Sequence, residues 1–114
     1  MLKPLLGSTT KEKLLLYLLT HGEAYPREMA SAFGFDVFRA QNQLGRLEDG
    51  GVVVSRLRGK VRLYQLNPRY PFRKELEKLL WRALDFYPAD EREGLYTPRL
   101  RPRRAGKPIR YVEG

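Results

Sequence analysis

The run LLLYLL at positions 14–19 constrains the fold of this chain more than any other segment. Thr9 and, three residues later, Glu12 predict a capping box at the start of a helix, and Ser8 is the other candidate for the cap. Gly22 predicts the end of this helix. Because consecutive residues are 100° apart, six apolar residues in a row cover every face of a helix. The helix therefore lies at the centre of the fold or contacts a second subunit on one side, and we favour the second subunit.

The composition restricts the classes of function that the chain can have. Its 114 residues suffice for one domain with a modest core. A formal net charge of +9 indicates an anionic partner, either nucleic acid or a membrane surface. The longest apolar run is too short to cross a membrane, and the N-terminus lacks the apolar core of a signal peptide. We therefore expect a cytoplasmic protein with no membrane partner.

Catalytic and metal-binding residues are sparse. The chain has no cysteine, which excludes disulfides, thiolate metal sites and a cysteine nucleophile. His21 is the single histidine, and we expect it to interact with the dipole at a helix end rather than to act as a ligand or base. No Ser/His/Asp, HExxH, Walker A or GxGxxG pattern occurs. We predict no enzymatic activity, no metal site and no cofactor.

Two helices separated by a glycine turn follow the first helix. The segment YPREMASAFGF places Pro26 in the first turn of a short helix, which Gly34 ends. Asp36 then predicts the cap of a longer helix over residues 36–49. Apolar residues on this helix recur at offsets of three and four and form one core-facing stripe, whereas the opposite face is polar. The stripe comprises Val37, Ala40, Leu44 and Leu47.

A basic hairpin, another helix and a basic tail complete the chain. Residues 52–66 are β-branched or alternating, with Arg58-Gly59 as the turn, and they predict two antiparallel strands. The run from 72 to 86 returns to helical periodicity. Residues 93–114 hold three prolines and six Lys or Arg residues, so we expect an extended or disordered tail. We therefore divide the chain into a domain at 1–92 and a tail at 93–114.

This order of elements predicts a mainly α fold with a small β-hairpin, of the α+β class. A short helix joined by a tight turn to a longer helix is the helix-turn-helix arrangement. The major groove of B-DNA is about 12 Å wide, admits one α-helix, and presents a distinct hydrogen-bonding pattern for each base pair. A helix that reads this groove needs one apolar face toward its own domain and long hydrogen-bonding side chains on the other. Residues 36–49 have both.

The chain resembles winged helix-turn-helix transcriptional regulators of the ArsR/MarR type over about residues 5–87. The sequence LLGSTTKEKLLLYLL is similar to their first helix, and YPREMASAFGF is similar to their positioning helix. The segment ending LGRLEDGGVV is similar to the close of their recognition helix, and GKVRLYQLNP to the return strand of their wing. The resemblance implies a three-helix core, a wing and a C-terminal dimerisation helix.

The chain departs from this family at three points. Val37 and Phe38 stand where many relatives have Ser or Thr, and Gly45 lies inside the recognition helix at a cost of about 1 kcal/mol relative to Ala. The cysteine-containing metal site of the family's metal sensors is absent, so metal sensing through thiolates is not implied.

Together these features predict a homodimeric transcriptional regulator that binds specific sequences of double-stranded DNA, with repression favoured over activation. The helix at 36–49 would enter the major groove, and the hairpin would contact the flanking phosphates. The candidate base-reading residues are Phe38, Arg39, Gln41, Asn42, Gln43 and Arg46. The candidate wing residues are Arg56, Arg58, Lys60 and Arg62.

Two further groups of residues are candidates for contacts. Arginines of the tail would contact DNA as an extended arm. Apolar residues of the first and last helices would form the dimer contact. The tail residues are Arg99, Arg101, Arg103 and Arg104, and the dimer residues are Leu15, Leu18, Leu19, Leu76, Leu80, Trp81 and Leu84.

The sequence leaves other functions open. The domain resembles winged helices that act as protein-interaction or accessory modules, for example beside a nucleotidyltransferase, and its charge would then be incidental. The arginine-rich tail would also suit RNA. An unidentified effector that binds along the last helix is a further alternative.

Overall fold

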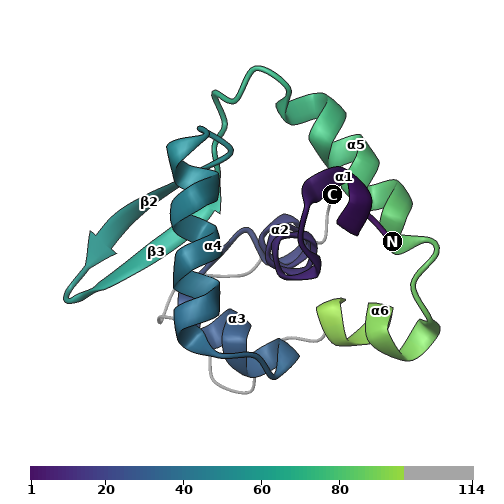
Figure 1. Cartoon of the computed structure of the whole chain (residues 1–114), viewed down its shortest axis with the longest axis horizontal. Helices are drawn as coiled ribbons and strands as arrows, with labels where there is room; N and C mark the ends of the chain where they lie inside the picture. The colour runs from purple at the N-terminus through teal and green to yellow at the C-terminus, as the bar shows by residue number, and fades with distance from the viewer. Residues whose placement is uncertain (97–114) are drawn as a thin grey trace.

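The computed structural model describes residues 1–96 and is built around one central helix. Figure 1 shows this helix, α2 (Thr9–His21), nearly end-on in the middle of the molecule, with the other helices arranged around it. The side chains from Leu14 to Leu18 are all buried, and Leu19 is partly exposed. Five of the six residues of the apolar run are therefore covered by the chain's own elements, and the expectation that a second subunit is needed to cover this helix is wrong.

The start of α2 differs from the predicted capping box. Ser8 is the cap, and its hydroxyl accepts a hydrogen bond from the Lys11 backbone N–H at 3.1 Å. Glu12 then lies one residue beyond the position that a capping box requires. Because consecutive helical residues are 100° apart, Glu12 points toward the interior, where it is 1% exposed. Its carboxylate accepts a hydrogen bond from the Leu2 backbone N–H at 3.0 Å. This bond attaches the short helix α1 (Lys3–Leu6) to α2.

The predicted pair of helices is present. Helix α3 (Pro26–Phe33) begins at its proline and ends at Gly34, whose φ of 75° lies in the left-handed region that favours glycine. Helix α4 (Val37–Asp49) follows after two more residues. Helices α3 and α4 pack against each other, and α4 also packs against α2.

A three-stranded antiparallel sheet lies next to α4. The predicted hairpin consists of β2 (Val53–Arg58) and β3 (Val61–Leu66), and the sheet order is β1-β3-β2. Because the last residue of β2 pairs with the first of β3, the turn is Gly59-Lys60, one residue later than expected. The two-residue strand β1 (Glu23–Ala24) was not predicted. In Figure 1 the hairpin extends away from the helices, beyond α4.

The last two helices pack against α2 from the other side. Helix α5 (Arg73–Leu84) was predicted, but α6 (Ala89–Tyr96) was not, and it crosses the predicted boundary between residues 92 and 93. Leu95 belongs to the core, with 3% of its surface exposed. The described residues thus form six helices and one small sheet, which confirms the predicted α+β class. None of the helices in this part of the chain has the length and apolarity to cross a membrane.

Candidate nucleic-acid interface

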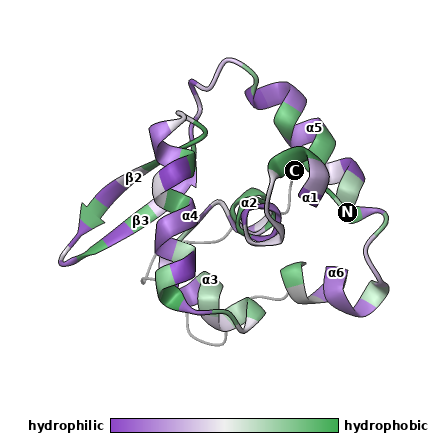
Figure 2. Ribbon diagram, in the orientation of Figure 1, coloured by the Kyte–Doolittle hydropathy of each residue, from purple (hydrophilic) through white to green (hydrophobic). Residues whose placement is uncertain are grey.

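Helix α4 is held by one apolar stripe and leaves the other face open. Ala40, Leu44 and Leu47 are buried against the core, and Val37 is half-buried beside them. The Asp36 side chain accepts the Phe38 backbone N–H at 3.3 Å and fixes the first turn. This packing sets the rotation of the helix, as the spacing of the stripe predicted. Figure 2 shows the resulting alternation of hydrophilic and hydrophobic residues along α4.

Five of the six candidate base-reading side chains lie on the open face. They include two guanidinium groups that suit guanine and two amides that suit adenine. Gln43 departs from the prediction, because it lies at the edge of the face and its side-chain oxygen is buried without a hydrogen-bond partner among the described residues. The five exposed residues are Phe38, Arg39, Gln41, Asn42 and Arg46.

The four cations of the wing do not lie on one face of the hairpin. Side chains alternate along a strand, so Arg56 and Arg58 point to one face of the hairpin and Arg62 to the other. Lys60 is exposed in the turn. Arg56 is also engaged within the chain, because its guanidinium lies 3.4 Å from the Glu23 carboxylate. Arg58 and Lys60 take part in no ion pair among the described residues and are therefore better placed than Arg56 to meet an external anion.

Hydrogen bonds attach the wing to α4. The Ser55 hydroxyl donates to the Glu48 carboxylate at 2.8 Å and accepts from the Arg62 guanidinium at 3.0 Å. This series of hydrogen bonds orients Arg62 toward α4. Next to it, burial raises the pKa of the Tyr64 hydroxyl, and the negative charge of Glu48 adds to this effect. Tyr64, like any tyrosine at neutral pH, is protonated and can donate a hydrogen bond.

A groove of about 330 Å³ lies between α4, the wing and the start of α3. Three cations line it: Arg27, Lys60 and Arg62. Sequence reasoning missed Arg27 and its neighbour Tyr25, which also lines the groove. Their position next to Pro26, at the start of the helix before the turn, was the signal available. The groove offers positive charge and hydroxyl groups beside the open face of α4, a combination that suits a phosphodiester backbone.

The predicted dimer residues divide into two groups. Leu15, Leu18, Leu80 and Leu84 are buried in the chain's own core and have almost no surface left for a partner. Leu19, Leu76 and Trp81 are partly exposed. The dimer prediction therefore depends on these three residues. The tail candidates Arg99, Arg101, Arg103 and Arg104 lie outside the described residues.

The remaining titratable residues do not assemble a metal site in the described part of the chain, where no group of three or more His, Asp or Glu side chains is placed to hold an ion. His21 lies at the end of α2, as expected. It is buried, its ring stacks on Tyr17 with 3.8 Å between ring centroids, and its Nδ1 lies 3.2 Å from the Tyr17 carbonyl oxygen. These contacts give it a packing role.

A three-helix core with a hairpin wing directly after its third helix is the winged helix-turn-helix fold. The chain is similar in structure to a mutant of ZitR from Lactococcus lactis, with a TM-score of 0.53 and 16% sequence identity. The alignment covers 75% of this chain and 66% of that one.

The apo form of the same ZitR mutant gives a TM-score of 0.52 and 18% identity, over 75% of this chain and 73% of the ZitR chain. At these sequence identities the likeness shows a shared fold and nothing more. No protein-family model matches the sequence, and no curated protein matches it.

Proposed function

We propose that this protein is a transcription regulator that binds specific sequences of double-stranded DNA. The observation that carries the proposal is the division of α4 into a buried stripe and an open polar face. Placed in the major groove, the open face would bring Arg39, Gln41 and Asn42 to the edges of the bases, where such side chains distinguish one base pair from another.

The wing and the basic groove would supply affinity. Arg27, Lys60 and Arg62 line the groove beside α4 and would neutralise phosphates of the strand that borders the major groove. The net charge of +9 favours the approach of the protein to DNA before any specific contact forms. Specificity would come from α4 and most of the affinity from the cations.

We further propose that the protein acts as a homodimer and as a repressor. A dimer of this fold would place its two α4 helices about 34 Å apart, on successive half-sites of one face of DNA. Leu19, Leu76 and Trp81 are the candidate contacts that keep some exposed surface. Light scattering across a concentration series, with Trp81→Ala as the variant, tests this part: a monomer at every concentration would contradict it.

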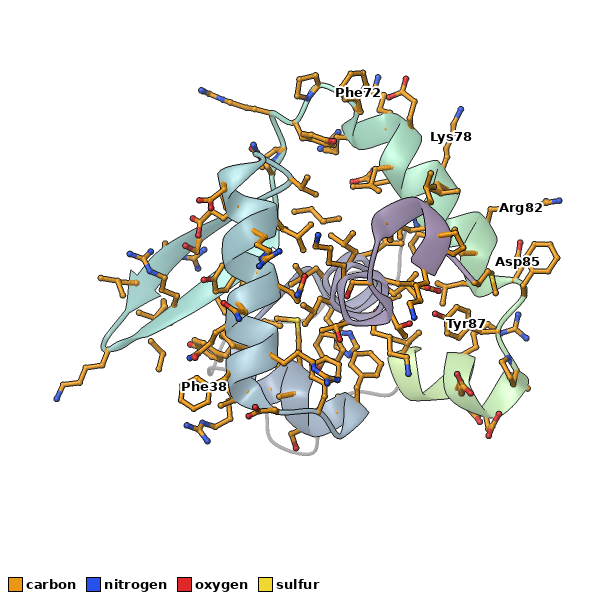
Figure 3. All side chains as sticks on the ribbon, viewed as in Figure 1. Phe38, Phe72, Lys78, Arg82, Asp85 and Tyr87 are labelled. Carbon is orange, nitrogen blue, oxygen red and sulfur yellow. The ribbon has the colours of Figure 1, made fainter. Side chains whose placement is uncertain are left out.

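Binding to fragments of the source genome tests the main proposal. The protein should select a small set of fragments, and its affinity for them should fall steeply as salt rises. Arg46→Ala should weaken binding to the selected fragments by about 5- to 150-fold, the effect of losing one bidentate base contact. Arg82→Ala is the matched control, because it removes one charge from an exposed position on α5, far from α4 in Figure 3.

Equal affinity for selected and random DNA would contradict sequence-specific regulation. Equal losses from Arg46→Ala and Arg82→Ala would show that charge alone, and not α4, is responsible.

One observation favours a second function, that of a protein-interaction module. Leu57 and Val61, on opposite faces at the end of the wing, are 60% and 50% exposed, and both apolar side chains would stay in water on a wing that only meets phosphates. A protein partner bound through them would stay bound at high salt. Replacement of both residues by Ser would then abolish the complex, whereas Lys60→Glu would leave it intact.

A further inference from the structure

Phe38 is the most exposed large apolar side chain among the described residues. Phe38 is the second residue of α4, and 73% of its surface is exposed. Figure 3 shows the ring extending outward from the first turn of α4, away from the helices behind it. Nothing in the fold requires an aromatic side chain there, and a phenyl group in water forgoes the free energy that burial provides.

The packing of α4 fixes where this ring points. Ala40, Leu44 and Leu47 hold the opposite side of the helix in the core, and the Asp36 cap holds the Phe38 N–H. Gln41 and Asn42 follow Phe38 by three and four residues, so the three side chains share one face. The ring is therefore part of the face that we assign to the bases and does not lie at its border.

The chemistry of the major groove offers one apolar group to such a ring. Guanine, adenine and cytosine present hydrogen-bond donors and acceptors at their major-groove edges, whereas thymine also presents its C5-methyl group. A phenyl ring cannot form hydrogen bonds, so contact with any other edge would bury a polar atom without a partner. The C5-methyl group is thus the contact that Phe38 can make at the lowest cost.

We propose that Phe38 selects thymine by contact with its C5-methyl group. The inference rests on the proposed function, since it needs α4 in the major groove. It names a base preference that the polar residues of α4 do not supply.

A change made only to the DNA tests the inference without any risk to the fold. First, the wild-type protein selects a bound fragment from genomic DNA. Each thymine of the bound core is then replaced in turn by deoxyuridine, which removes the methyl group and keeps every hydrogen bond. At one position in each half-site we expect affinity to fall about fourfold, the equivalent of about 0.8 kcal/mol for one apolar carbon.

Protein variants identify the residue responsible. Phe38→Ala should weaken binding to the thymine fragment and should show no further loss with deoxyuridine at that position, because the two changes remove the same contact. Phe38→Leu should retain part of the effect. Phe72→Ala is the matched control: Phe72 is 61% exposed at the start of α5, at a different end of the molecule from Phe38 in Figure 3, and this variant should keep the full fourfold dependence.

The outcomes separate this inference from the proposed function. Failure to select any fragment would overturn both. A selected fragment that binds equally well with deoxyuridine at every thymine would overturn the assignment of Phe38 and leave the regulator intact. A methyl dependence that persists unchanged in Phe38→Ala would also overturn it, because another residue would then contact the methyl group.

Discussion

The hydroxyl of Tyr87 donates a hydrogen bond to Oε2 of Glu12, a residue 75 positions earlier in the chain. The other carboxylate oxygen of Glu12 accepts the Leu2 N–H. A buried carboxylate needs such partners, because without them the cost of removing its charge from water is not recovered. These two bonds join the N-terminal segment, α2 and the connection between α5 and α6.

Removal of the Tyr87 hydroxyl should destabilise the fold. In Tyr87→Phe, buried Glu12 loses one of its hydrogen bonds, and we expect the free energy of unfolding to fall by about 1–3 kcal/mol. Urea denaturation measures the change. Tyr70→Phe is the control, since Tyr70 is half-buried and packs by its ring against Phe72, and it should change the free energy by less than about 0.5 kcal/mol. Similar losses in both variants would contradict the role of the Glu12 bond.

The same contact predicts a pH dependence in the alkaline range. Burial raises the pKa of Tyr87, and the hydrogen bond to Glu12 and its negative charge raise it further. Because the folded pKa lies above the unfolded value of about 10, the contribution of Tyr87 to stability is fully present below pH ~10 and is lost as the pH rises above it. The stability difference between the wild type and Tyr87→Phe should therefore shrink above pH ~10. A difference that stays constant to pH 11 would contradict the raised pKa.

Much of the site could be predicted from the sequence because it depends on local signals. Pro26, Gly34 and Asp36 each favour one backbone position at a helix end, and the structure has α3 and α4 where they placed them. The stripe from Ala40 to Leu47 then fixed which face of α4 is open. These signals lie within a few residues of the features that they determine.

The features that were missed depend on contacts between distant segments. Strand β1 consists of two residues and exists because Ala24 pairs with Tyr64, 40 positions later. Helix α6 lacks a strong periodic pattern, and Leu95 is buried because it reaches the central helix. A stretch of sequence does not show which elements will cover it, which is also why the run at 14–19 suggested a second subunit.

The wing cations should differ in their effect on DNA binding. Lys60 is exposed and takes part in none of the ion pairs found among the described residues, whereas Arg56 is paired with Glu23. Lys60→Ala should weaken binding to all DNA sequences to a similar degree and reduce the slope of log K against log salt by about 1. Arg56→Ala should change the slope less. Salt titrations of both variants measure this, and equal slopes would contradict the distinction.

Replacement of Gly45 should separate stability from binding. Gly45 lies in the middle of α4 without a left-handed backbone, and a Cβ atom built there would meet nothing within 4 Å. Gly45→Ala should therefore stabilise the fold by about 0.5–1 kcal/mol in thermal unfolding, because alanine loses less backbone entropy in a helix. Gly59→Ala is the control: its φ of 68° is unfavourable for alanine, so this variant should be destabilised.

The fold itself thus gives no reason for a glycine at position 45, but the proposed function does. Gly45 follows Phe38 by seven residues and Gln41 by four, so it lies on the open face of α4, where the absence of a side chain lets DNA approach the helix backbone. We expect Gly45→Ala to bind the selected fragment more weakly than the wild type although it is more stable. A stabilised variant with undiminished affinity would show that DNA does not come close to α4 at this point.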